Sequence, residues 1–203
     1  MQKDKKIILM VLLLILTFSL TTAAQNNFFQ NEDEHNNLRF GNEYIVIVVN
    51  QNENSKGRFA VETTGGAPAR ENDDNKPLIY GRPNPWTSYT SLWINEEKYV
   101  FGGSTERRAG DGAKYGEVIQ EPTVEDNQLI TRTRFDNIVV EQILSIVKSS
   151  TTGLADSAQI QYRVINEGDQ EEKVGLRVML DTMLGENDGA PFRLGEDTIS
   201  TDK

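Results

Sequence analysis

The chain has no cysteine and only one histidine, His35, among its 203 residues. The absence of cysteine excludes disulfide staples, a thiol nucleophile and a lipid-modified N-terminal cysteine. The single histidine lies in a polar N-terminal stretch, which argues against a Ser-His-Asp triad and against a histidine-rich zinc site. Stability must therefore come from the burial of apolar side chains, and any site chemistry from oxygen donors, amides, arginines and aromatic rings.

Positive charge is also scarce, because 21 Lys and Arg face 31 Asp and Glu, a formal net charge of −10. A strongly acidic surface repels phosphate groups, so we expect no nucleic acid partner and no attachment to anionic lipid. The same charge suits solubility outside the cell and the binding of divalent cations.

The N-terminus has the three parts of a secretory signal peptide. Lys3, Lys5 and Lys6 precede an apolar run over residues 7–16, and small residues follow up to Ala24. We expect cleavage near Ala24, which makes residues 1–24 the signal peptide. The mature protein is then secreted or held in the cell envelope, extracytoplasmic, with no membrane insertion after cleavage. The alternative is an uncleaved anchor, although the apolar run is short for a membrane span.

Short β-branched and alternating segments, separated by Gly, Asn and Asp turns, predict an all-β fold, an antiparallel β-sandwich. Residues 25–42 are rich in Asn, Gln and acid, and we expect them to form a flexible lead-in to a domain over residues 43–203. Residues 138–147 could be helical, but their six Ile and Val residues favour a strand. Strands are expected at residues 44–49, 58–63, 78–80, 86–94, 99–103, 116–124, 127–135, 138–147, 156–166 and 173–183. Residues 197–201 begin a further strand, which is either an edge strand or a sign that the domain is incomplete at its C-terminus.

Residues 160–169, IQYRVINEGD, form a Tyr-x-Val-x-Asn-x-Gly strand and turn, and residues 174–178, VGLRV, are expected to pair back on that strand. This pair resembles the paired strands of uncharacterised exported bacterial β-sandwich modules and is weakly similar to galactose-mutarotase-like sandwiches. The resemblance implies a β-sandwich, in the form of a truncated supersandwich. Mutarotases use histidines at the sugar, so the resemblance concerns the fold and not the activity.

Two clusters are candidates for binding sites. Asp181, Glu186 and Asp188 supply hard oxygen ligands near the turn-forming Gly185 and Gly189, which makes Ca²⁺ a candidate cofactor. The alternative is that Asn187, Asp188 and Gly189 simply form a turn.

The second cluster is a candidate ligand site formed by Arg82, Asn84, Trp86 and Tyr89, in which rings stack on a sugar while Arg and Asn bind its hydroxyls. The alternative is that these aromatic rings fill the core.

The leading hypothesis for function is a non-catalytic module that binds carbohydrate or protein, with a glycan or an envelope protein as its partner. A carbohydrate-active enzyme would need paired carboxylates, for which Glu141 with Asp181 or Glu62 is a formal option. A structural envelope module is the third hypothesis. It predicts an exposed apolar edge near the C-terminus.

Overall fold

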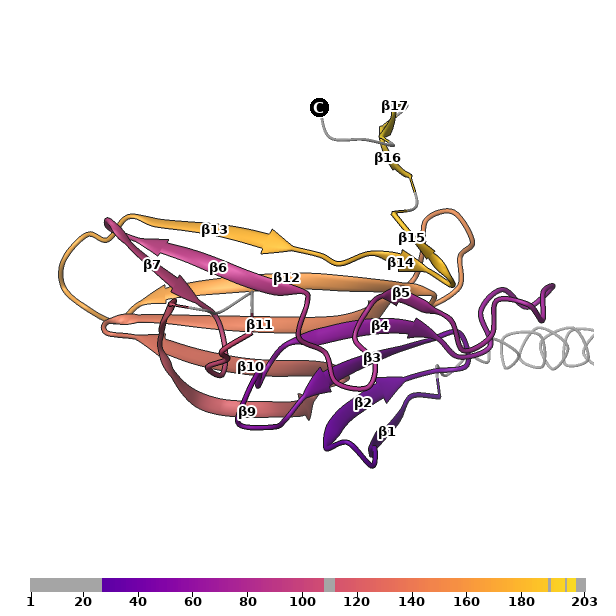
Figure 1. The fold of residues 1–203 in the computed structure, drawn as a ribbon, viewed down its shortest axis with the longest axis horizontal. Coiled ribbons are helices and arrows are strands. Elements are labelled where there is room, and N and C mark those ends of the chain that lie inside the picture. The colour runs from indigo at the N-terminus through magenta and orange to yellow at the C-terminus, as the bar shows by residue number, and fades with distance from the viewer. Residues whose placement is uncertain (1–26, 108–111, 190, 196, 200–203) are drawn as a thin grey trace, which may run out of the picture.

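The computed structural model describes residues 27–107, 112–189, 191–195 and 197–199. The expected signal peptide, residues 1–24, lies outside these ranges. Every regular element in the described ranges is a β-strand, which confirms the all-β prediction (Figure 1). A search of these ranges for a helix long and apolar enough to cross a membrane found none.

The first of three main sheets is formed by strands that follow each other along the chain, and we call it the N-terminal sheet. All its neighbouring strands are antiparallel, and the register of β3 with β4 pairs one apolar residue with another at most positions. Its strands, in spatial order, are β1 (Phe29–Glu32), β2 (Asn37–Gly41), β3 (Ile45–Asn50), β4 (Phe59–Thr63) and β5 (Pro77–Ile79).

The second sheet holds the longest strands and is called the long sheet. Its spatial order is β12 (Ser157–Asn166), β11 (Ile138–Val147), β10 (Gln128–Phe135) and β9 (Glu117–Glu125). The third, the mixed sheet, contains β13 (Val174–Met179), β6 (Tyr89–Ile94), β7 (Glu97–Val100) and β8 (Lys114–Tyr115), with β7 and β8 parallel. Two short hairpins follow, β14 (Met183–Leu184) with β15 (Asn187–Asp188), and β16 (Phe192–Leu194) with β17 (Asp197–Ile199).

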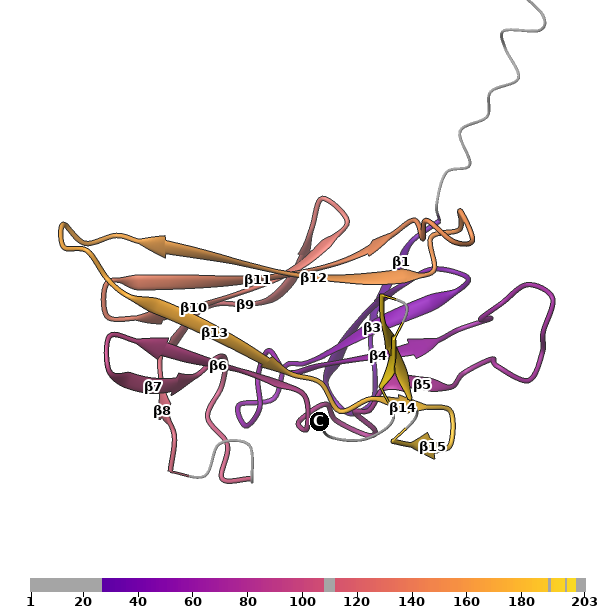
Figure 2. The same cartoon turned by 90° about the horizontal axis from the view of Figure 1, so that it is seen from above.

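The long sheet forms one layer of a sandwich, and the N-terminal and mixed sheets lie side by side in the other layer (Figures 1 and 2). One half of the long sheet, including Leu129 and Leu144, packs on the N-terminal sheet at Phe40 and Phe59. Its other half, including Val140, packs on the mixed sheet. The long strands thereby hold the two shorter sheets together across two adjoining cores.

Strand β11 shows why the sequence forms this layer. It lies in the interior of the long sheet, and all its residues up to Ile146 are buried. A strand in such a position has no solvent face and therefore needs a nearly continuous apolar sequence. The prediction of a strand over residues 138–147 is confirmed at both ends.

Two expectations were wrong. The segment expected to be a flexible lead-in contains β1 and β2, and Leu38 and Phe40 belong to the core. The sandwich therefore begins before residue 43. Strand β13 does not pair back on β12 but crosses to the other layer, where it pairs with β6. The turn after β12 is thus a connection between layers and not a hairpin.

Candidate functional site

The segment between β5 and β6 carries most of the predicted ligand residues, and two buried asparagines fix its path. Asn37 and Asn50 lie opposite each other on β2 and β3 and are almost fully buried. The Asn37 side-chain amide donates to the Pro83 carbonyl at 3.0 Å, and that of Asn50 donates to the Pro85 carbonyl at 2.9 Å. These bonds hold the backbone on both sides of Asn84.

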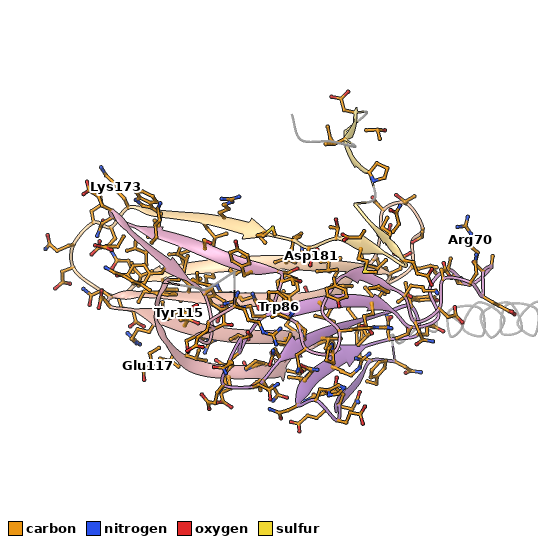
Figure 3. All side chains as sticks on the ribbon, in the orientation of Figure 1. Arg70, Trp86, Tyr115, Glu117, Lys173 and Asp181 are labelled. Carbon is orange, nitrogen blue, oxygen red and sulfur yellow. The ribbon has the colours of Figure 1, made fainter. Side chains whose placement is uncertain are left out.

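Asn84 and Trp86 line one wall of a pocket of about 730 Å³. This volume lies within the range of small-molecule sites. The lining is rich in amides and hydroxyls, together with two aromatic rings, and it includes Asn50, Asn52, Asn84, Thr105, Trp86 and Tyr115. Figure 3 shows Trp86 and Tyr115 in the middle of the molecule, with Asp181 above them.

Hydrogen bonds preorganise this pocket. The Asn50 side-chain oxygen accepts from the backbone and side-chain nitrogens of Asn52, at 2.9 and 3.0 Å. The Tyr115 hydroxyl donates to the Thr105 carbonyl at 3.0 Å. Asn84 also lines the pocket, but its Oδ1 atom is buried away from solvent and has no hydrogen-bond partner within the described residues.

Trp86 supplies the aromatic surface of the pocket. Its side chain is half-buried, and the guanidinium of Arg107 lies over the ring at 4.7 Å from the centroid. Glu106 adds one carboxylate to the lining and Arg107 one cation. The lining is therefore close to neutral, which suits an uncharged polyhydroxylated ligand better than a strongly charged one.

Arg82 points away from this pocket. Its Nε donates to Glu62 at 2.7 Å and its Nη2 to the Asn75 carbonyl at 2.9 Å. The hydrogen bond to Glu62 raises the pKa of Arg82. Arg82 lines a separate depression with Arg39 and Asp33, in which cations and carboxylates neutralise each other. Arg82 therefore does not line the pocket that contains Trp86.

Tyr89 also lies outside the pocket, on the outer face of the mixed sheet. Its ring is 5.6 Å from the guanidinium carbon of Arg58. Arg58 is 2% exposed, and its guanidinium interacts with the side chains of Tyr115 and Tyr89. Burial lowers the pKa of Arg58, while the charge interaction and hydrogen bond with Tyr115, and the charge interaction with Tyr89, counteract part of this effect. No sequence pattern predicted this buried cation.

The predicted calcium ligands are not brought together. Glu186 lies in the turn between β14 and β15, Asp188 pairs with Met183 across that hairpin, and Asp181 precedes it. The described residues contain no group of three His, Cys, Asp or Glu side chains that could hold a metal ion. Gly185 and Gly189 have positive φ, at 67° and 95°, so the segment forms turns, as the alternative interpretation expected.

The carboxylate pair of Glu141 and Glu62 is not formed either. Val140, the neighbour of Glu141, points into the core, as does Val61 beside Glu62, so both carboxylates face outward from opposite layers. Glu141 is also engaged by two arginines, at 2.6 Å from Arg132 and 3.0 Å from Arg163.

Several pocket residues were missed because they come from segments distant in the sequence. Asn50 and Asn52 lie in a stretch that was interpreted only as turn chemistry, and Arg107 and Tyr115 border a loop with no recognisable motif. The repeated asparagines of residues 50–54 were the available signal, since clustered amides are common at sites that bind hydroxyls. Comparison with family models, curated proteins and solved structures found no match for this chain.

Proposed function

We propose that this protein is an exported, non-catalytic module that binds carbohydrate in the pocket around Trp86. The pocket lining supports the proposal, because an indole ring beside several amides and hydroxyls matches the alternating apolar faces and hydroxyl edges of a sugar. Glu106 is the single carboxylate among the described lining residues, so these residues do not supply the carboxylate pair that hydrolysis needs.

The test is titration of the protein against a glycan panel, with the chain's two tryptophans as a matched pair. Trp86→Ala removes the ring in the pocket, and Trp93→Ala removes an exposed ring outside it. We expect Trp86→Ala to weaken binding about tenfold, because aromatic contacts contribute roughly 1 kcal/mol beyond area burial. Trp93→Ala should retain wild-type affinity. Loss of binding in Trp93→Ala alone, or release of hydrolysed sugar by the wild type, contradicts the proposal.

A second candidate function has its own observation. A structural envelope module would pack its sandwich on another protein, and several apolar side chains of β13 and the segment after it are more than a third exposed. These include Leu176, Val178, Met179, Leu180 and Leu184. Exposed apolar side chains gathered on one part of a surface are typical of protein contacts.

A further inference from the structure

Both layers of the sandwich end in an edge strand on the same side of the molecule. β12 is the last strand of the long sheet and β13 the last strand of the mixed sheet, and no described strand pairs with the outer edge of either. Figure 2 looks onto this side and shows β12 and β13 diverging from the connection that joins them. Each outer edge therefore presents backbone N–H and C=O groups that a further strand can pair with.

β12 lacks the features that protect the opposite edge of the long sheet. It runs for ten residues in continuous register with β11, contains no proline, and has Arg163 as its only charged residue. The opposite edge strand, β9, has register shifts around Pro122 and carries Glu117, Glu121 and Glu125. Prolines, bulges and charges are the usual means of blocking edge pairing. The long sheet is thus blocked at one edge and open at the other.

The space beside the open edge is lined by side chains that face inward but are not buried. Leu176 pairs with Leu92 and Val178 with Thr90, so both point to the same side as these buried residues. Val164 pairs with the fully buried Val140 on β11. Even so, Val164, Leu176 and Val178 are 42%, 39% and 36% exposed. An added strand would cover all three.

The outer face of β12 has an uncompensated positive charge. Arg132, Glu141 and Arg163 lie opposite each other on β10, β11 and β12. One carboxylate thus serves two guanidinium groups, and the Arg163 side chain is 59% exposed. A strand added beside β12 would continue the alternation of positive and negative charges across the sheet if it placed an acidic residue opposite Arg163. Opposite charges stabilise such cross-strand pairs.

We propose that the open edge of β12 binds an extended segment of a partner protein by strand addition. The segment has apolar side chains at alternate positions, which cover Val164, Leu176 and Val178, and an acidic side chain between them that faces Arg163. A second copy fits poorly, because the outward positions of its own β12 carry no acid and each copy has a net charge of −10. This inference deepens the protein-binding alternative and does not depend on the pocket around Trp86.

The probe is a synthetic peptide as long as β12, in which valine alternates with threonine and one central threonine is replaced by glutamate. We expect saturable binding to the full chain by fluorescence anisotropy, with increased amide protection in β12 by hydrogen exchange. A peptide with lysine in place of the glutamate should bind about fivefold more weakly, because like charges opposite each other are destabilising. A peptide with N-methylated alternate amides should not bind, because it cannot complete the backbone ladder.

Two protein variants locate the site. Val164→Lys should weaken binding by about tenfold or more, because the added strand would bury an unpaired ammonium group. The matched control is Ile119→Lys, a residue 40% exposed on the blocked edge strand β9. This control should change the affinity by no more than about twofold, as is usual for surface substitutions. Leu176→Lys on β13 tests the same site if Val164→Lys folds poorly by circular dichroism.

The proposal is overturned if the peptide does not bind the wild type or if the N-methylated peptide binds equally well. It is also overturned if Val164→Lys and the control Ile119→Lys weaken binding alike. Concentration-dependent dimerisation that Val164→Lys abolishes would assign the edge to a second copy and overturn it too. Glycan titration of Val164→Lys separates the two functions, since this variant should keep the wild-type affinity for sugar whatever the peptide result.

Discussion

Replacing Arg58 by methionine tests how the fold tolerates a buried cation. The Arg58 guanidinium is buried, hydrogen-bonds the side chain of Tyr115, and lies 5.6 Å from the ring centroid of Tyr89, so its partners are neutral phenols and not carboxylates. Removing a charge from water costs several kcal/mol unless close partners compensate for it. Methionine keeps an unbranched apolar side chain in that space and removes the charge.

The size of the expected change in stability follows from the contacts that Arg58→Met removes. The cation–π contact with Tyr89 contributes about 0.5–2 kcal/mol, and the hydrogen bond with Tyr115 contributes about 1.5 kcal/mol or more. The desolvation cost of the guanidinium exceeds this, and replacement of buried charges by apolar residues of similar volume stabilises proteins by about 1–4 kcal/mol in favourable cases. We expect Arg58→Met to raise the free energy of unfolding by roughly 1–3 kcal/mol. For a chain of this size, each kcal/mol raises the melting temperature by about 2–4 °C.

Urea denaturation followed by tryptophan fluorescence measures the effect, with an unchanged m-value as the sign that only stability has changed. Lys56→Met is the matched control. Lys56 is also buried, but its ammonium group lies 2.6 Å from Glu121 and 3.6 Å from Glu53. Its removal should leave stability unchanged or lower it by up to about 1 kcal/mol. A loss of more than about 1 kcal/mol in Arg58→Met would refute the reasoning and show that Arg58 makes a net favourable contribution.

Two further substitutions test other contacts. Burial alone would raise the pKa of Asp33, but hydrogen bonds from Asn37 and from the His35 backbone lower it below 3.8. Asp33→Asn should therefore cost about 1 kcal/mol at neutral pH. The difference in unfolding free energy between the wild type and Asp33→Asn, measured by chemical denaturation, should shrink as the pH falls below 3.8, because a carboxyl with a lowered pKa loses its contribution on protonation. A difference that does not change with pH would contradict this prediction. Tyr162→Phe removes a hydroxyl that contacts Thr90 on the mixed sheet and accepts from Gln142 at 2.8 Å. We therefore expect this variant to lose about 1–3 kcal/mol of stability in thermal unfolding. An unchanged melting temperature would contradict this prediction.

The strands that could be predicted are those with a dense local signal. β11 was predicted with its observed bounds, because an interior strand needs a run of apolar residues whatever its partners are. β1 and β2 were missed because their asparagines resemble a disordered segment. In the structure an asparagine of this segment is structural: Asn42, directly after β2, donates to the Ala155 carbonyl at 2.7 Å and accepts from the Ile45 amide at 3.0 Å. Composition cannot distinguish an amide that satisfies buried backbone groups from one that is solvated.

The candidate site could be predicted only in part, for a related reason. Asn84 and Trp86 stand out by turn chemistry and aromatic content, and they do share a pocket. Arg82 and Tyr89 are as close in the sequence, but the irregular path of the chain turns them toward other surfaces. That path is set by Asn37 and Asn50, which lie far away in the sequence. Long-range hydrogen bonds of this kind leave no pattern in a local window.

The strand with which β13 pairs determines whether the outer edge of β12 is free to bind another strand. Had β13 paired back on β12, as the hairpin interpretation required, the edge of the long sheet would have been closed and its apolar residues covered. β13 instead pairs with β6 in the other layer. Its alternating sequence suits either sheet, because alternation specifies a buried face and not a neighbouring strand. The crossing leaves two unpaired edges with exposed apolar side chains between them, and backbone groups in this arrangement are best satisfied by another strand.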